Sequence, residues 1–400
     1  MTAQSRPREP RSSAALGALV FVLALNIRPA VSALGPLVPM IHDQEGMTEG
    51  ALGILGAVPL IAFAVVSPLA YLPSRRWGMD RTLFVALAIM AAGIGLRSGA
   101  GTPGLWLGTL VLGVAAAVFN VLAPTVVRRD YPRRLSAATG VYSACMTIGA
   151  AIATAVVVPI AQAWGWRIAM ALWAVPVVAL AAAWIPRATR PRADLSEAES
   201  ALPERNVWRS WKAWMLTANM SLRAFTFYVA TTWMPTIEVA YGFSEAEASL
   251  HLTAFSIVGI AGSLLFPVLQ NHTRTQAPAG IWCGMPMALG ALGLIVFPDA
   301  ALLWMLVAGF GAGASVTVAL SLLSMVGRDA LETARLSGMS QSFGHVVAAL
   351  GPIAAGFLGQ ATGSWTPTLV MLIAASGLQA VVGGLVGKGI VARDAGRNHP

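Results

Sequence analysis

The sequence contains few charged residues for its length. Only 11% of its 400 residues are Asp, Glu, Lys or Arg, whereas soluble globular proteins average about 25%. Apolar residues make up 56% of the chain, and its mean hydropathy is +0.70. A water-soluble enzyme and a large nucleic-acid-binding module are therefore excluded, which leaves an integral membrane protein. The net charge of +9 is then to be read loop by loop, as a guide to orientation rather than to a nucleic-acid partner.

The residues that most catalytic and metal sites require are also scarce. The two cysteines, Cys145 and Cys283, both fall in apolar runs, so a disulfide between them has no support. The five histidines show no metal-ligand spacing with cysteines or carboxylates. The sequence also lacks the phosphate-binding loop of ATPases, an HExxH string and a nucleophile elbow. We therefore predict no catalysis, no metal and no cofactor.

Apolar segments dominate what is present. Each is long enough to cross a bilayer as a helix, and all are too long and too uniformly apolar for barrel strands. They lie near residues 14–41, 49–72, 81–98, 104–127, 136–163, 166–185, 211–237, 246–269, 278–297, 301–325, 335–361 and 367–388. We predict an all-α integral membrane protein with twelve transmembrane helices in two six-helix, pseudo-symmetric bundles. The predicted domains are an N-terminal bundle over 1–186, a cytoplasmic linker over 187–209 and a C-terminal bundle over 210–400.

An internal repeat supports this division. Gly140 and Gly165 in the first half, and Gly338 and Gly363 in the second, are separated by the same interval of 25 residues, with an offset of 198 between the halves. In each half the first glycine follows an Arg-Asp pair at the end of the preceding apolar segment. Order, spacing and segment number agree together, as expected for repeated halves.

Basic residues are distributed unevenly between the two sides of the predicted bundle. The N-terminus, the even-numbered connections and the C-terminal tail hold 22 of the 26 Lys and Arg residues. The other side holds two, Arg97 and Arg167, together with acidic residues such as Glu45 and Glu238. Because basic loops stay on the cytoplasmic side, both termini are predicted to be cytoplasmic.

Two arginines lie deep inside apolar segments. Arg28 is 14 residues into the first segment and Arg223 about 12 residues into the seventh, its counterpart in the repeat. A charge near the bilayer midplane is costly and faces a cavity or a partner, yet no Asp or Glu lies deep in any segment. Two guanidiniums without a resident carboxylate indicate an anion site. The alternative is that each is satisfied locally by helix carbonyls or by snorkelling. Pro29 should loosen the helix beside Arg28.

Other polar residues at useful depth are candidates to contact a substrate. Gln341 and His345 are four residues apart and share a helix face. His345 either donates to an anion, carries a proton or is a packing residue, and the two asparagines nearest the arginines either contact substrate or make ordinary interhelical hydrogen bonds. His251 is a weaker functional candidate. The full set of predicted substrate-binding residues is Arg28, Arg223, Asn26, Asn120, Tyr142, Asn219, Tyr228, Gln341 and His345.

Several strings resemble a known family. Twelve segments in two repeated halves resemble the major facilitator superfamily. The strings ALNIRPAVSALGPLVPMI, NVLAPTVVRRDYP, FYVATTWMPTIEVAYGFSEAEA and RLSGMSQSFGHVVAALGPIAAGFLGQATGSW resemble the cyanate-transporter-like (CynX/NimT) family within it, over most of the chain. The resemblance implies the superfamily fold, transport by alternating access and a functional monomer. Family members are associated with cyanate uptake and nitroimidazole efflux.

The resemblance also indicates gate residues and departures from the family pattern. The implied gating residues are Arg81, Arg129, Asp130, Arg328 and Asp329. The string PLAYLPSRRWGMDR lacks the early Gly and Asp of the superfamily loop, which leaves the usual cytoplasmic gate contacts open. Arg223 stands where a Gln is common in the family, and His345 where a Tyr is common.

Together these observations predict a secondary active transporter in the bacterial inner membrane. The expected substrate is a small anion, such as a cyanate-like, nitrate- or nitrite-like ion or a short carboxylate, held by Arg28 and Arg223. The first alternative is an exporter of neutral nitroimidazoles or drug-like compounds, with Phe227, Tyr228 and Trp233 supplying aromatic contact. A channel or a receptor is the alternative outside transport. The energy source and the direction of transport are left open.

Overall fold

The computed structural model describes residues 14–67, 69–131, 135–189, 207–270, 275–326 and 330–388. These residues form helices throughout the membrane-length segments, which confirms the predicted all-α fold. The first half comprises α1 (Ala14–Ile27), α2 (Pro29–Ser32), η1 (Gly35–Leu37), α3 (Val38–Glu45), α4 (Glu49–Val66), α5 (Tyr71–Trp77), α6 (Met79–Gly99), α7 (Gly101–Asp130), α8 (Leu135–Trp164), α9 (Trp166–Ala171) and α10 (Ala174–Ala188). The second comprises η3 (Val207–Arg209), α11 (Trp211–Ala240), α12 (Glu245–Gln270), α13 (Ala277–Trp282), α14 (Met285–Val296), η4 (Pro298–Ala300), α15 (Ala301–Val326), α16 (Ala330–Thr362) and α17 (Thr366–Lys388).

Eleven helical segments in the described residues are long and apolar enough to cross a membrane. Helix α11 is not among them, although its 30 residues extend about 45 Å at 1.5 Å per residue. It carries Lys212, Arg223 and Glu238, and these charges lower its hydropathy. With α11 included, the described residues form the predicted twelve membrane-length units.

The first of these units is interrupted where the sequence places its charge. Helix α1 ends at Ile27, Arg28 is a turn residue, and Pro29 begins the short helix α2. Proline has no backbone N–H to donate, so the α-helical ladder cannot continue through it unchanged. A second break follows at Ala33, before η1 and α3. The predicted loosening beside Arg28 is confirmed, and backbone carbonyls near Arg28 become available to other donors.

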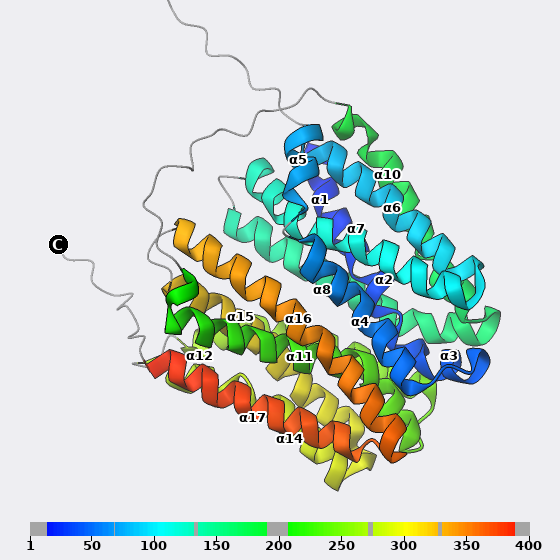
Figure 1. Ribbon diagram of the computed structural model, residues 1–400, viewed down its shortest axis with the longest axis vertical. Helices are drawn as coiled ribbons and strands as arrows, with labels where there is room; N and C mark the ends of the chain where they lie inside the picture. The colour runs from blue at the N-terminus through cyan, green and yellow to red at the C-terminus, as the bar shows by residue number, and fades with distance from the viewer. Residues whose placement is uncertain are drawn as a thin grey trace, which may run out of the picture.

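The two halves lie beside one another, and α4 and α16 run together along their border (Figure 1). Glycines allow the backbones to touch there: a Cβ at Gly53 would lie 2.4 Å from the carbonyl oxygen of Pro352, and one at Gly35 would lie 2.2 Å from that of Thr231. The N–H of Gly50 donates to Oε1 of Gln360 at 3.2 Å. We call the contact of the first half with α11 and α16, through Gly35, Gly50 and Gly53, the seam. The seam lies towards the end of the molecule away from Ala14 and Lys388.

An apolar core continues across the seam. It combines Leu37 and Ile41 of the first half with Trp233 and Ile237 of the second. The indole nitrogen of Trp233 donates to the carbonyl of Pro352 at 2.9 Å, and its ring lies 4.8 Å from that of Trp365. Because burying apolar surface favours association, this core holds the two halves together at the seam end. Trp233 is committed to that packing rather than exposed for contact with a ligand.

Candidate functional site

Arg28 lies at the break in the first unit and points its charge towards the second half. Its guanidinium carbon is 6.0 Å from the ring centroid of Phe227 on α11. Among the described residues its side chain makes no ion pair or hydrogen bond, and the residue is half-buried. A cation over an aromatic face is attracted by about 0.5–2 kcal/mol, far less than the cost of removing a guanidinium from water. The positive charge of Arg28 is therefore largely uncompensated by the protein.

Arg223 lies one helical turn before Phe227 on the same face of α11. Its Nε atom is buried and has no hydrogen-bond partner in the described part of the chain. Its charge acts electrostatically on Arg28, which it repels, and on Tyr228 and Cys283. Two half-buried guanidiniums from opposite halves thus share one region.

His345 and Tyr142 bring two further helices to this region. Both arginines act electrostatically on His345 of α16, whose ring lies edge-on to Phe63 at 5.3 Å. Arg28 also acts on Tyr142 of α8, whose hydroxyl is buried without a partner among the described atoms. We call Arg28, Tyr142, Arg223, Tyr228 and His345 the central cluster. It draws on the α1–α2 break and α8 from one half, and on α11 and α16 from the other.

The remaining predicted substrate-binding residues stand outside the central cluster. The amide of Asn26 donates to the carbonyl of Val22 within α1 at 2.8 Å. Asn219 is buried and donates to the carbonyl of Gln379 on α17 at 3.3 Å. The Asn219 bond joins α11 to α17, as in the interhelical alternative raised from the sequence, whereas the Asn26 bond stays within α1. Asn120 is half-buried on α7, and Gln341 is exposed on α16, one turn before His345.

A half-buried charge network occupies the other end of the first half. Arg129 pairs with Asp80 and with Asp130, at 2.8 Å each. Arg187 pairs with the same two carboxylates at 2.9 and 2.7 Å and donates to the carbonyl of Leu16 at 2.7 Å. The network therefore ties the ends of α6, α7 and α10 to the start of α1.

This network contains predicted and missed residues. Arg129 and Asp130 were expected at the gate, whereas Asp80 and Arg187 were not. Asp80 is the Asp of the string PLAYLPSRRWGMDR, in which the early Asp of the superfamily loop is missing. Arg187 was expected to be the first residue of the linker but lies in α10. Arg81 instead donates to the carbonyl of Ala188 at 3.0 Å. Arg328 and Asp329 lie outside the described residues.

Two charged residues assigned to connections are buried in helices. Arg97 is 1% exposed within α6, and its Nη1 donates to the carbonyl of Ala30 at 2.8 Å, beside the break. Glu238 is 0% exposed within α11, with Oε2 2.7 Å from Nδ1 of His251. Both assignments were wrong. Arg97 lies inside the predicted segment 81–98 and within α6, and α11 continues beyond residue 237 to include Glu238. No simple sequence signal marks either contact, since the partners are 67 and 13 residues away.

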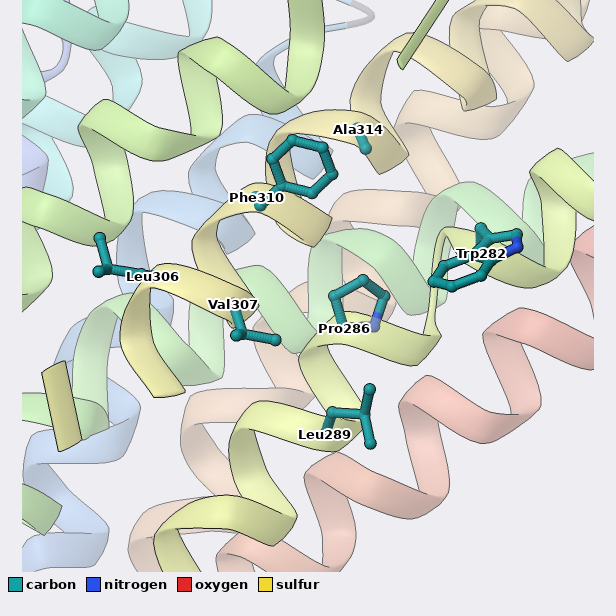
Figure 2. Close-up of a pocket in the computed structure, with 7 residues that line it drawn as sticks. All are labelled: Trp282, Pro286, Leu289, Leu306, Val307, Phe310 and Ala314. Atoms are coloured by element: carbon teal, nitrogen blue, oxygen red, sulfur yellow. The ribbon is translucent and has the colours of Figure 1, made fainter. Parts of the chain in front are cut away.

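A separate cavity of about 380 Å³ lies between α13, α14 and α15 (Figure 2). All seven side chains around it are apolar except for the indole nitrogen of Trp282. They are Trp282, Pro286, Leu289, Leu306, Val307, Phe310 and Ala314. Binding sites for polar ligands need a few placed polar groups, so this cavity does not suit an anion. The central cluster remains the candidate site.

Comparisons with known proteins agree with the fold and point to transport. The family model described as "Major Facilitator Superfamily" matches residues 15–328. The "2-nitroimidazole transporter" of Escherichia coli is 36% identical over 373 residues, covering 92% of this chain and 94% of that protein. The "Cyanate transport protein CynX" of the same organism is 25% identical over 351 residues, covering 87% and 91%. Among solved structures, a bacterial homolog to the human lysosomal transporter Spinster matches with a TM-score of 0.79 at 15% identity, over 97% of this chain and 100% of that one.

Proposed function

Because this chain belongs to the major facilitator superfamily of transporters, within its cyanate-transporter-like (CynX/NimT) family, we propose that it carries a small anion across the membrane. Arg28 and Arg223 bind the anion between the two halves. The observation that carries this proposal is that both guanidiniums are half-buried, act on one another and lack a carboxylate partner among the described residues. The counter-charge then arrives with the substrate.

The physical argument concerns the cost of closing an empty site. Enclosing two like charges without a partner is unfavourable, because burial removes water and low polarity strengthens their repulsion. A bound anion offsets both costs through charge-assisted hydrogen bonds. Since a ligand shifts an equilibrium only by its differential affinity for the two states, the anion favours the conformation in which both arginines surround it. Arg28 can adjust because it lies at a break rather than inside a continuous helix.

The alternating-access cycle follows from the same geometry. In this structure the halves are packed at the seam, and transport requires that the seam opens while the other end closes. We infer that the seam faces the cell exterior and that both termini are cytoplasmic in the bacterial inner membrane, from the distribution of basic residues. The proposed halves are the bundles 1–186 and 210–400 of a functional monomer, joined by a cytoplasmic linker over 187–209.

The first test is thermal stabilisation of the purified protein by a panel of cyanate, nitrate, nitrite, short carboxylates and 2-nitroimidazole. A ligand at 100 times its Kd stabilises the folded state by about 2.7 kcal/mol. We expect one class of small anion to raise the Tm. Arg28→Gln and Arg223→Gln should each abolish that shift. Arg128→Gln is the matched control, because Arg128 is exposed on α7 and loses the same charge.

A second candidate function, transport of a neutral nitroaromatic compound, rests on two aromatic residues of α11 close to Arg223. Phe227 and Tyr228 lie edge to face with ring centroids 5.3 Å apart, and one relative carries the name 2-nitroimidazole transporter. Stabilisation by 2-nitroimidazole alone, kept in both arginine variants, would overturn the anion proposal in favour of this one.

A further inference from the structure

A carboxylate and an imidazole are paired inside the seam end of the second half. Nδ1 of His251 on α12 lies 2.7 Å from Oε2 of Glu238 on α11. The Glu238 side chain is fully buried, and the His251 side chain is 14% exposed. The other carboxylate oxygen, Oε1, is buried and has no hydrogen-bond partner among the described atoms. Neither residue belongs to the central cluster.

The two helices that hold this pair both contact the first half. Glu238 and Thr231 are seven residues apart and so lie on one face of α11, and the carbonyl of Thr231 is the atom that Gly35 of the first half approaches. On α12, the hydroxyls of Thr253 and of Thr154 from α8 of the first half lie 2.9 Å apart. Helix α11 thus meets the first half on the face that carries Glu238, whereas His251, two positions before Thr253, lies on the other side of α12, where its ring packs on Phe243. Separation of the halves would therefore bring water to the Glu238 side of the pair.

The net charge of the Glu238–His251 pair determines the free-energy cost of closing the seam over it. A neutral imidazole that donates its Nδ1–H to an ionised carboxylate leaves one negative charge buried. One additional proton, shared between the two groups, makes the pair neutral overall. Burying an uncompensated charge is far more costly than burying a neutral or zwitterionic pair. In an open, hydrated seam the proton is not required, because water solvates the carboxylate.

We propose that Glu238 and His251 form a proton-binding site that takes up one proton when the seam closes. The proton comes from the medium at that end and returns to it when the seam reopens. By linkage, acidic medium then stabilises the sealed conformation. The proposal depends on alternating access but not on which substrate is carried.

The other charged groups at this end are already paired or act from a distance. Glu247 is exposed, accepts from the N–H and hydroxyl of Ser244 and acts electrostatically on His251. The Glu245 carboxylate makes a hydrogen bond with the side chain of Gln162 and is repelled electrostatically by Asp43. The described parts of α8, α16, α17 and η1 bring no charged side chain to this end. Further titratable groups at this end are His42, which contacts the carbonyl of Met47, Glu45, paired with Arg167, Glu49 at the start of α4, and Asp299 in η4. Arg97, in the last turn of α6, donates to the carbonyl of Ala30.

The test measures the seam directly as a function of pH. Spin labels at Gln44→Cys on α3 and Ser364→Cys between α16 and α17, both exposed positions, report the separation of the halves by pulsed electron resonance. Cys145 and Cys283 are replaced by serine. Between pH 8 and pH 5 we expect the ratio of sealed to open molecules to rise by up to about tenfold per pH unit, the limit for one linked proton.

Two variants should move the seam in opposite directions. Glu238→Gln removes the buried charge, so the sealed population should be high and independent of pH. His251→Gln leaves the carboxylate without its partner, so the seam should be open at pH 7.5 and seal only in acid. Asp299→Asn, which removes an exposed carboxylate in η4 of the same half, is the control and should keep the wild-type profile. A wild-type distance that does not change with pH would overturn the proposal, as would an unaltered pH profile in Glu238→Gln.

Discussion

Replacing Gly53 by alanine should open the seam by adding a single methyl group. The new Cβ would lie 2.4 Å from the carbonyl oxygen of Pro352, and real Cβ atoms essentially never approach closer than 3.0 Å. The obstacle is backbone, which cannot rotate aside, so α4 and α16 must separate by at least about 0.6 Å at this point (from 2.4 to 3.0 Å). Inserting a methyl group into such a contact costs roughly 1–3 kcal/mol.

This cost arises only in the sealed conformation. The gain in helix propensity from glycine to alanine, about 0.5–1 kcal/mol, is the same whether the seam is open or sealed, because α4 is helical in both. The ratio of sealed to open molecules should therefore fall by about 5- to 150-fold. The spin-label pair at Gln44→Cys and Ser364→Cys measures that ratio as the weights of a short and a long distance.

Gly377→Ala is the matched control, since a Cβ at Gly377 on α17 would meet no atom within 4 Å. It should leave the distance distribution unchanged. An unchanged distribution in Gly53→Ala would refute the reasoning, because the seam would then tolerate an approach that close packing forbids. A loss of folded protein without any shift towards the long distance would refute it equally, since the cost would then not be specific to the sealed state.

Two further predictions concern the other charged groups. Asp80→Asn should lower the free energy of unfolding by about 2 kcal/mol, because Asp80 pairs with both Arg129 and the buried Arg187 and hydrogen bonds to charged groups contribute about 1.5–3 kcal/mol. Thermal unfolding, compared with that of the exposed-site variant Asp43→Asn, measures this loss, and equal stability of the two variants would contradict the prediction. Arg97→Met should weaken binding of the stabilising anion by about tenfold, because the carbonyl of Ala30 beside Arg28 loses its donor; a Kd equal to that of Arg128→Met would show that Arg97 does not position this segment.

Sequence alone predicted those features that depend on neighbouring residues. The apolar segments and the break at Pro29 follow from local composition and from the chemistry of proline. Arg28 and Arg223 could be singled out because a charge inside an apolar run is anomalous whatever surrounds it. Their electrostatic contact across the two halves was expected from the equivalence of the first and seventh segments.

Features that depend on where helices end, and on distant partners, could not be predicted. Glu238 was placed in a connection because hydropathy fades before α11 stops, and Arg97 was counted with a connection although it lies inside its apolar segment. A tertiary partner, not propensity, keeps each charge inside. Asp80 was overlooked because its position in the string differs from the superfamily pattern, although its carboxylate reaches Arg129 and Arg187. Asn219 was predicted to bind substrate together with Arg223, whereas its amide donates to the carbonyl of Gln379 on α17.

The distribution of buried charge connects the two proposals. The centre holds the uncompensated positive charges of Arg28 and Arg223, whereas the seam end holds Glu238, whose pair with His251 is negative unless it binds a proton. If both proposals hold, the anion and the proton favour the same sealed conformation. Linkage then requires each to raise the affinity of the other. The two sites are about 22 Å apart along α11, from the 15 residues between Arg223 and Glu238, so this coupling must act through the opening of the seam rather than through direct attraction. Anion affinity should therefore increase in acid in the native protein, and in Glu238→Gln it should stay high at every pH.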